Sequence, residues 1–350
     1  MSDNLLMSQD DNLIIELGQA ANRVAAQHTI QDYRERKSLN TLRAQDADLL
    51  LFAEFIKSTG ITDKFTFTEP TAWRGISWGL VKGFVQWLLT QDYSIGSVNR
   101  TLATVKVYAR LAFQSGSVEE KEYLMIKGVQ GYSPKESKRI NERRTATRKV
   151  RTVNGTTKPY KKPEAILISR DQAKQLKEHP DTPQGRRDAV LMHLLLDHGL
   201  RAGEVALLTI GNVNLGEKTL TFYRPKVDKL QTLELTSGTW RTLKAWMNAG
   251  DAPLAADAPL LRGSRKGGSL TEPGMSERAI TDRVRVLAEE RIGVQGYSAH
   301  DTRHYWATYF YKKCKDPMRL QEAGGWNSLA MPRRYVEWAT IANEGVGDLD

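Results

Sequence analysis

One stretch in the middle of the chain constrains the fold more than any other, because it cannot belong to a packed core. Residues 133–163 lose the apolar periodicity seen elsewhere and carry eleven lysines or arginines against two glutamates. A run of such one-sided charge is typical of a linker or arm rather than a packed element. The sequence therefore predicts two separate cores joined by a basic linker.

The length of the chain agrees with this division. Its 350 residues exceed one typical core and suffice for two domains that each bury a core of their own. We expect an N-terminal arm over residues 1–38, a helical domain over 39–132, the basic linker over 133–164 and a second domain over 165–350.

The sequence does not resemble a membrane protein or a secreted one. No apolar run approaches the length of a membrane span, and the N-terminal residues MSDNLLMSQDD are acidic where a signal peptide would be basic. The single cysteine, Cys314, excludes an internal disulfide framework and a cysteine-cluster metal site. We expect a cytoplasmic protein.

The first domain is predicted to be a small helical bundle, preceded by one helix in the arm over residues 12–26. Its apolar residues recur with helical spacing over 48–56 and 76–89, and a third helix begins after Ser94. In this third helix, steps of four and three residues define a buried stripe that consists of Val98, Leu102, Val105, Ala109 and Ala112.

The charge of the chain suits a polyanionic partner. Lysines and arginines number 51 against 41 acidic residues, a formal net charge of +10, which favours binding to a polymer such as DNA. Basic residues off the buried stripe are available to phosphates, although a solvated basic face explains them equally well. The candidate DNA contacts come from the third helix and from the basic linker. They are Arg100, Lys106 and Arg110 of the helix and Lys138, Arg139, Arg143 and Arg144 of the linker.

The second domain is predicted to mix helices with a small antiparallel sheet, so the fold class is mainly α (α+β). Residues 218–223 and 230–235 alternate like two strands, and the turn between them carries Lys226. Apolar faces and caps predict helices that cover residues 170–177, 187–198, 237–247 and 276–291, with a loop over 262–269.

The segment from Ser298 to Trp338 holds side chains suited to binding a phosphate. His300 and Arg303 stand three residues apart, so a helix beginning near Ala299 puts both on one face, within reach of a single anion. This pair is a candidate oxyanion clamp.

Two shorter helices are expected to follow. Asp316 before Pro317 is typical of a helix start, and Gly324-Gly325 is typical of its end. Ser328 is expected to cap a last helix, which carries Tyr335. A tyrosine at this place can face a backbone phosphate.

The second domain resembles the tyrosine recombinase (lambda-type integrase) family, in its Cre-like and Xer-like members. HGLRAGEVALL is similar to the family's first arginine box, SAHDTRHYWAT to its His-x-x-Arg box and AGGWNSLAMPRRY to its final box. The resemblance covers residues 165–340, and the helical first domain resembles the family's core-binding domain by position and size. In the family's order, the chain carries Arg201-x-x-Glu204, Lys226, His300-x-x-Arg303, Trp326 and Tyr335.

These residue types suit attack on a phosphodiester. Its negative oxygens repel a nucleophile, so a catalyst without a metal needs fixed cations around the non-bridging oxygens. Arg201 and Arg303 suit this task because a guanidinium matches phosphate geometry bidentately. His300 and the Trp326 indole N–H, where most family members carry a histidine instead, add donors.

Tyr335 is the predicted nucleophile. Its hydroxyl has a pKa near 10, and the surrounding positive charge is expected to favour the phenolate. Lys226, on a mobile hairpin, is the predicted general acid for the departing sugar hydroxyl, and Lys229 is the alternative. Glu204 is expected to orient Arg201 or His300.

Four other polar residues are assigned lesser roles. His304, beside Arg303, either acts directly or supports its neighbours. The remaining three are expected to be structural, namely Asp301, His193 and His198.

The resemblance implies the rest of the chemistry. Attack leaves a 3′-phosphotyrosine and a free 5′-hydroxyl, and strand exchange runs through a Holliday junction in a homotetramer on double-stranded DNA with inverted-repeat sites. The phosphodiester energy is conserved, so the resemblance implies no metal, ATP or other cofactor. DNA integration, excision and resolution are all outcomes of this chemistry.

The sequence therefore predicts a site-specific DNA recombinase. Two alternatives share its fold or its chemistry. One is a type IB topoisomerase that relaxes DNA, and the other is a DNA-binding protein of the same fold that has lost activity.

Overall fold

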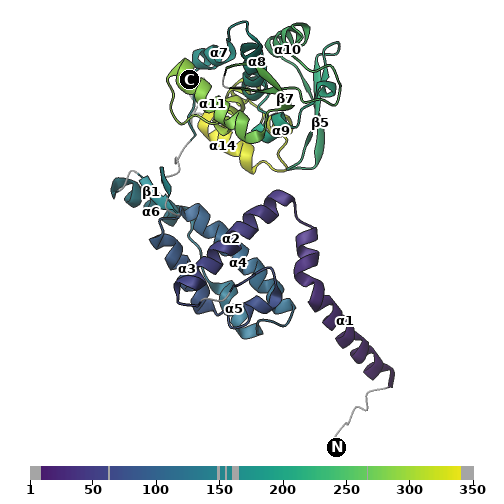
Figure 1. Cartoon of the computed structure of the whole chain (residues 1–350), viewed down its shortest axis with the longest axis vertical. Coiled ribbons are helices and arrows are strands. Elements are labelled where there is room, and N and C mark those ends of the chain that lie inside the picture. Colours follow the sequence, from purple (N-terminus) through teal and green to yellow (C-terminus); the bar gives the residue numbers. More distant parts are fainter. Residues whose placement is uncertain are drawn as a thin grey trace, which may run out of the picture. The chain divides into compact units, whose positions relative to one another are not determined.

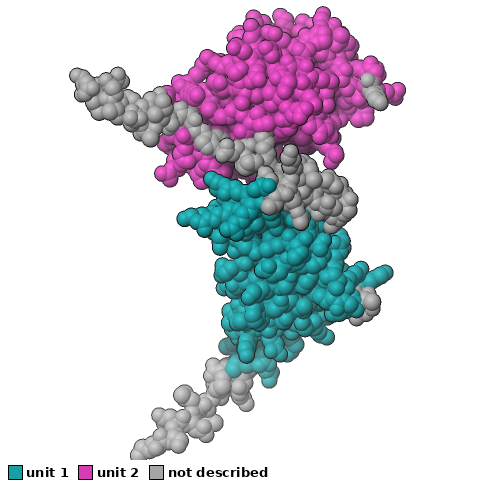
Figure 2. All heavy atoms as spheres, turned by 90° about the vertical axis from the view of Figure 1, so that its left-hand side faces the viewer, with its two compact units in different colours: residues 1–162 teal, residues 163–350 magenta. Residues whose placement is uncertain are grey.

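The structure is a computed structural model that describes residues 9–61, 64–147, 150–153, 156–159, 165–265 and 267–339. The chain divides into two compact units, residues 1–162 and 163–350 (Figure 2). None of the helices in these described ranges is both long and apolar enough to cross a membrane.

Unit 1 is a helical bundle that ends in a short β-hairpin (Figure 1). Its strands β1 and β2 pair in antiparallel fashion, with Val150 opposite Pro159. In chain order, its elements are α1 (Gln9–Glu35), α2 (Leu39–Ser58), the 3-10 helix η1 (Pro70–Trp73), α3 (Trp78–Thr90), α4 (Ile95–Gln114), α5 (Glu120–Gly128), α6 (Pro134–Thr147), β1 (Val150–Val153) and β2 (Thr156–Pro159).

Serine caps and one apolar stripe explain the order of this bundle. Ser38, Ser77 and Ser94 each accept a hydrogen bond from the third residue of the helix that follows, which satisfies a backbone donor at its start. All five residues of the stripe predicted in α4 are buried, as expected. They pack into one core with aromatic rings from α2 and α3, among them Phe52 and Phe84, whose ring centroids are 4.9 Å apart.

The N-terminal arm differs from the prediction, because its helix α1 is longer than residues 12–26 and its end is packed. Ile30 is buried in the bundle core. Arg34 donates to Asp46 of α2 at 2.6 Å and to the Tyr108 hydroxyl of α4 at 2.9 Å. The last turn of α1 therefore belongs to the bundle.

The basic stretch also differs from a plain linker, because residues 134–147 form helix α6. Ser133 and Glu136 exchange hydrogen bonds that cap its start. Arg144 donates to the carbonyl oxygens of Tyr93 at 2.7 Å and Leu89 at 3.0 Å, at the end of α3. A helix can therefore pack here through caps and a charged side chain, without an apolar stripe.

Unit 2 is mostly helical, with small antiparallel sheets, as predicted. One sheet has the order β3-β4-β5, and β6 pairs with β7, so part of the expected loop 262–269 is a strand. In chain order, its elements are α7 (Arg170–Lys177), α8 (Pro183–Asp197), α9 (Ala202–Ala206), the 3-10 helix η2 (Ile210–Asn212), β3 (Val213–Asn214), β4 (Thr219–Arg224), β5 (Lys229–Glu234), α10 (Ser237–Asn248), β6 (Arg262–Ser264), β7 (Leu270–Gly274), α11 (Glu277–Ile292), α12 (Ala299–Cys314), α13 (Pro317–Gly324) and α14 (Ala330–Ala339).

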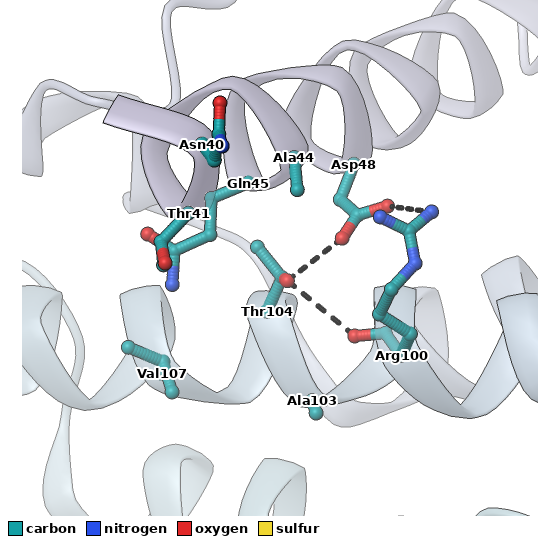
Figure 3. A pocket seen from close by; sticks show the side chains of 9 residues that line it. All are labelled: Asn40, Thr41, Ala44, Gln45, Asp48, Arg100, Ala103, Thr104 and Val107. Carbon is teal, nitrogen blue, oxygen red and sulfur yellow. Dashed lines mark hydrogen bonds and ion pairs between the residues drawn. The ribbon is translucent and has the colours of Figure 1, made fainter. Parts of the chain in front are cut away.

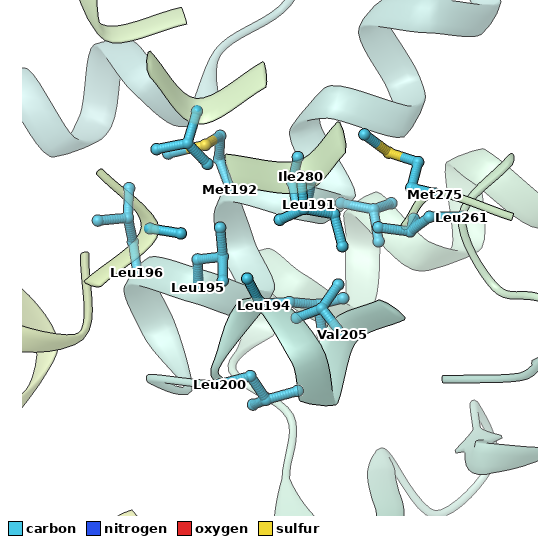
Figure 4. Packing of buried hydrophobic residues seen from close by; sticks show 14 of the residues in the cluster. Leu191, Met192, Leu194, Leu195, Leu196, Leu200, Val205, Leu261, Met275 and Ile280 are labelled. Carbon is cyan, nitrogen blue, oxygen red and sulfur yellow. The ribbon is translucent and has the colours of Figure 1, made fainter. Parts of the chain in front are cut away.

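Helix α8 runs through the core of this unit. Leu191, Leu194 and Leu195 of α8 are fully buried and lie in one apolar cluster with Ile280 of α11 and Leu261 (Figure 4). A buried Leu side chain is worth roughly 1.5–3 kcal/mol relative to an exposed one, so this helix is a rigid base for the loop that follows it.

That loop begins at a glycine that the packing requires. Gly199 has φ +61°, and a Cβ built there would lie 2.3 Å from the ring of Trp306 in α12. The tight turn at Gly199 places Arg201 directly at the start of α9.

The ends of α12 and α13 lie where the sequence predicts. Helix α12 begins at Ala299 behind a Ser298 cap, and Asp316 caps α13, which ends at Gly325 with φ +59°. Helix α14 begins at Ala330, one residue later than a cap at Ser328 requires.

Candidate active site

Three segments of unit 2 converge on one partly buried polar site. They are the turn from α8 into α9, the edge of the β4–β5 hairpin, and the run from α12 through α14. Of the predicted catalytic residues, this site brings together Arg201, Glu204, Arg303, Trp326 and Tyr335 through the contacts described below. His300 and Lys226 lie exposed on α12 and on the hairpin turn.

Arg303 is a buried cation at the centre of these contacts. It is 2% exposed and donates to the carbonyl oxygens of Gly199 and Gly324. Its guanidinium carbon lies 4.5 Å from the Trp326 ring centroid, in cation–π geometry. Burial, with help from the nearby charge of Arg201, lowers the pKa of Arg303 to about 9, so the group is still charged at neutral pH.

Glu204 holds Arg201, one of the two residues that it was expected to orient. The Arg201 guanidinium donates to one Glu204 carboxylate oxygen at 2.6 Å, and the Arg201 backbone N–H donates to the other at 2.8 Å. Burial acts to raise the pKa of Glu204, but the charge of Arg224, the Arg201 backbone N–H and the Arg201 guanidinium outweigh it and hold that pKa below its ordinary value. The Arg201 side chain is 25% exposed, so it is accessible from solvent.

A third arginine, Arg224, lies in the site and was not among the predicted residues. It is 0% exposed, and its Nη1 donates to both Glu204 carboxylate oxygens at 2.9 and 2.8 Å. The signal that identifies it is strand alternation, because Leu220, Phe222 and Arg224 form the buried face of β4. An arginine at a third inward position of a strand indicates a buried charge with a partner.

Tyr335 lies under the other side chains of the site. It is 1% exposed, and its ring centroid is 5.6 Å from that of Trp326 and 5.4 Å from that of His304. Burial raises the pKa of the Tyr335 phenol, and the charges of Arg303 and Arg201 offset this rise only in part. The positive charge therefore acts in the expected direction, but burial outweighs it, so the pKa of Tyr335 lies above its ordinary value.

Two histidines connect the surface to Tyr335. The rings of His300 and His304 are perpendicular, with centroids 4.6 Å apart. Burial and the neighbouring His300 lower the pKa of His304 to about 4, so His304 is neutral at neutral pH. His304 thus lies between His300 and Tyr335, the predicted nucleophile, which fits the supporting role considered for it.

The turn of the β4–β5 hairpin presents both candidate general acids. Lys226 and Lys229 are exposed there. The Tyr223 hydroxyl donates to Asp228 at 2.6 Å, and Asp228 has φ +49°, which tightens the turn. The geometry does not bring either lysine into the buried part of the site.

The residues expected to be structural have structural partners. Asp301 accepts hydrogen bonds from Ser298 and from the Ile166 backbone N–H at 2.9 Å. His193 pairs with Asp197 at 2.7 Å, and His198 lies 2.9 Å from the Thr239 hydroxyl.

A groove between α2 and α4 in unit 1 contains Arg100, one of the candidate DNA contacts (Figure 3). Its volume is about 470 Å³. Asp48, 1% exposed, accepts hydrogen bonds from Thr101 at 2.9 Å and Thr104 at 2.8 Å and pairs with Arg100 at 2.8 Å. The Arg100 side chain is half exposed, so Asp48 holds a cation at the mouth of the groove.

The other candidate DNA contacts lie on α4 and α6 with different partners. Lys106 donates to the Lys127 carbonyl at 2.9 Å, and Lys138 lies 3.9 Å from Glu142. Arg144 is held by α3 as described. The side chains of the remaining three, Arg110, Arg139 and Arg143, are exposed.

Asp48 supports a prediction about this groove. Asp48→Ala is expected to lower the free energy of unfolding of unit 1 by about 1–3 kcal/mol, because it leaves two buried hydroxyl groups without their acceptor. Amide hydrogen exchange of α2 and α4 measures the change. Asp46→Ala, which removes a half-exposed carboxylate two residues away in the same helix, is the matched control and is expected to have the smaller effect. Equal protection in wild type and Asp48→Ala contradicts the prediction.

Within the described residues, no group of three or more His, Cys, Asp or Glu side chains is placed to hold a metal ion. The charged groups of the site are instead guanidinium and carboxylate groups, together with a buried tyrosine. Guanidinium groups beside a buried tyrosine suit a reaction in which a tyrosine hydroxyl attacks a phosphodiester.

Comparison with known proteins identifies the family. Residues 167–340 match the model of the phage integrase family. The chain belongs to this family, whose members are tyrosine site-specific recombinases.

Curated relatives match most of the chain. It is 24% identical to the tyrosine recombinase XerC of Oceanobacillus iheyensis over 302 residues, which cover 85% of each chain. It is 23% identical to XerC of Bifidobacterium longum over 328 residues, covering 85% of this chain and 88% of that one.

Solved structures share the fold. The XerH site-specific recombinase bound to palindromic difH substrate matches with a TM-score of 0.58 and 18% identity over 100% of this chain and 90% of XerH. The Tn1549 transposon integrase in complex with transposon right end DNA matches with a TM-score of 0.62 and 11% identity over 93% and 97% of the two chains.

Proposed function

We propose that this recombinase cleaves and rejoins double-stranded DNA by means of Tyr335, Arg201, Arg303, His300, Trp326, Glu204 and Lys226. The observation that carries the proposal is the buried Tyr335 within a cluster of two guanidinium groups, one of which, Arg201, still faces solvent. Such an arrangement places fixed positive charge where a phosphate and a nucleophilic hydroxyl meet.

The arginines bind the scissile phosphate. Arg201 is held by Glu204 on one side, so its solvent-facing donors are left to a phosphate oxygen. Arg303 cannot move away, because two carbonyl oxygens and the Trp326 ring hold it. Their fixed positions mean that little reorganisation is needed when negative charge develops on the phosphate.

Tyr335 then attacks the phosphorus. Its phenol releases its proton to water as the bond to phosphorus forms, and the bond from phosphorus to the 5′-oxygen of the next nucleotide breaks. Lys226 gives a proton to that departing oxygen, for which an exposed place on a hairpin turn is suitable. A 3′-phosphotyrosine results, and attack by a 5′-hydroxyl of a second duplex reverses the step on the exchanged strand.

Relatives with known structures support a DNA partner and an assembly. The XerH and Tn1549 integrase structures are DNA complexes, and a lambda integrase dimer is bound to a core site. For this chain we propose inverted-repeat DNA as the substrate, a tetramer on paired sites with a Holliday junction, and a location in the cytoplasm on the DNA itself. The exposed arginines of α4 and α6 are the proposed phosphate contacts in unit 1.

A search for covalent product tests this function. Wild-type protein is incubated with a pool of genomic DNA fragments in EDTA and denatured in SDS, and the DNA that stays attached is sequenced. We expect attached DNA that is enriched in one inverted-repeat sequence, and no loss of it in EDTA. DNA that is bound before denaturation and absent afterwards would favour the inactive DNA-binding protein instead. Attachment without any sequence enrichment, together with relaxation of any supercoiled plasmid, would favour a topoisomerase.

A further inference from the structure

We infer that Arg224, with Gln231, is a positioning residue that ties the hairpin carrying Lys226 to the segment carrying Trp326 and Tyr335. The inference rests on the proposed function, in which Lys226 protonates the leaving oxygen. Arg224 is 0% exposed in the structure, so it acts through its neighbours and not by contact with DNA.

The first set of contacts joins the two strands of the hairpin to α13. The Arg224 Nε donates to the Gln231 Oε1 of β5 at 2.5 Å. Gln231 in turn donates through Nε2 to the Glu322 carbonyl at 2.8 Å, and Arg224 Nη2 donates to the Ala323 carbonyl at 3.2 Å. Both strands of the hairpin are therefore bonded to the end of α13.

The end of α13 is an electrostatic partner for these side chains. The last carbonyls of a helix lack intrahelical donors and carry partial negative charge. Here the carbonyls of Glu322, Ala323 and Gly324 accept from Gln231, Arg224 and Arg303 respectively. Two buried guanidinium groups thus stabilise the helix end that leads directly to Trp326.

The fit at this helix end is close. Gly325 has φ +59°, and a Cβ built there would lie 2.6 Å from the Arg224 Cδ. The Arg224 side chain therefore packs against the backbone of the turn just before Trp326, whose ring contacts Tyr335.

Arg224 is also close in sequence to the general acid. A single proline separates Arg224 from Lys226, and Pro225 limits the backbone freedom between them. The Nη1 of Arg224 also donates to both carboxylate oxygens of Glu204, and this carboxylate holds Arg201. One buried side chain therefore connects the element that carries the acid with those that carry the phosphate-binding arginine and the nucleophile.

The test compares two DNA substrates that differ in the leaving atom. Ordinary DNA leaves as a 5′-alkoxide that needs a proton, whereas a 5′-bridging phosphorothiolate leaves as a thiolate, a much weaker base that departs without one. If Arg224 positions Lys226, Arg224→Met slows covalent cleavage of ordinary DNA by about 10–100-fold, a part of the roughly 10²–10⁴-fold contribution of a general acid, and slows the thiolate substrate by less than about 5-fold. Arg224→Lys keeps the positive charge but loses the forked set of guanidinium donors. Its cleavage rate on ordinary DNA is expected to lie between those of the wild type and Arg224→Met.

A double mutant separates positioning from a general loss of structure. On ordinary DNA, Arg224→Met is expected to add little to the loss caused by Lys226→Ala, because both changes remove one function. Equal losses on both substrates, or losses that multiply in the double mutant, overturn the inference. Thr232→Val, on an exposed face of the same hairpin and bonded only to Thr221 among the described contacts, is the matched control with wild-type rates on both substrates.

Two further measurements keep the result interpretable. Gln231→Leu breaks the bonds to Arg224 and Glu322 without removing a buried charge. If Arg224→Met does not fold, this variant tests instead whether the contacts of Arg224 position Lys226. It is expected to show the same preference for the thiolate substrate. Wild-type protein that forms no adduct with either substrate contradicts the proposed function itself. Wild-type activity with equal slowing of the variants on both substrates contradicts only the role of Arg224.

Discussion

Tyr335→Phe is expected to bind DNA as wild type does and to form no covalent adduct, a loss of more than about 10⁴-fold, the scale seen when an enzyme loses its nucleophile. The substitution removes a single oxygen and keeps the ring that packs against Trp326 and His304. Stability and phosphate binding should therefore be kept. Labelled DNA that migrates with the protein in SDS gels measures the adduct, and a mobility shift without SDS measures binding.

A second tyrosine of the same apolar cluster provides the control. Tyr311 of α12 is buried in one apolar cluster with Tyr335, Trp306 and Leu320. Tyr311→Phe therefore removes a hydroxyl group from the same surroundings. We expect Tyr311→Phe to form the adduct at a rate near that of wild type. An adduct that persists in Tyr335→Phe means that another residue is the nucleophile.

Lys226→Ala is expected to slow cleavage of ordinary DNA by about 10²–10⁴-fold, the usual contribution of a positioned general acid. The loss should nearly vanish on a 5′-phosphorothiolate substrate, because a departing thiolate needs no proton. Single-turnover rates of adduct formation on both substrates measure the effect.

Lys229→Ala decides between the two lysines of the hairpin. Both side chains are exposed at the turn and differ by three positions, so the structure does not separate them by burial. If Lys229→Ala shows the loss on ordinary DNA and its rescue by the thiolate, while Lys226→Ala shows neither, Lys229 is the general acid. Slowing of Lys226→Ala by the same factor on both substrates removes it from that role.

Burial also affects the protonation state of Tyr335. Its raised pKa keeps the phenol protonated near neutral pH in the structure. In the proposed reaction, the positive charge of Arg201 and Arg303 therefore stabilises the phosphate and its developing negative charge more than it ionises Tyr335 in the resting protein. A cluster of arginines does not by itself lower the pKa of a tyrosine when desolvation acts in the opposite direction.

Much of the local structure was predictable because its signals lie close together in the chain. The Ser94 cap, the stripe of α4 and the starts of α12 and α13 each depend on residues within one or two turns. The order of the polar boxes, from Arg201 to Tyr335, likewise predicted the family that the comparisons show.

The basic stretch shows where periodicity is an incomplete guide. It carries no apolar stripe, so sequence patterning indicated a linker. Helix α6 forms there because caps at Ser133 and Glu136 and the bonds of Arg144 to α3 supply stability that an amphipathic pattern does not record. Packing that rests on a few polar contacts with residues about fifty positions away cannot be read from local spacing.

By itself, the sequence determined the family and the starts of α12 and α13, because both follow from short-range spacing and from the order of the boxes. Tertiary structure alone decided that Arg224 joins Glu204, that Tyr335 is buried, and that the end of α13 is bonded to Arg224, Gln231 and Arg303. These contacts join residues up to about a hundred positions apart, and the desolvation that sets their charges exists only once the elements have packed.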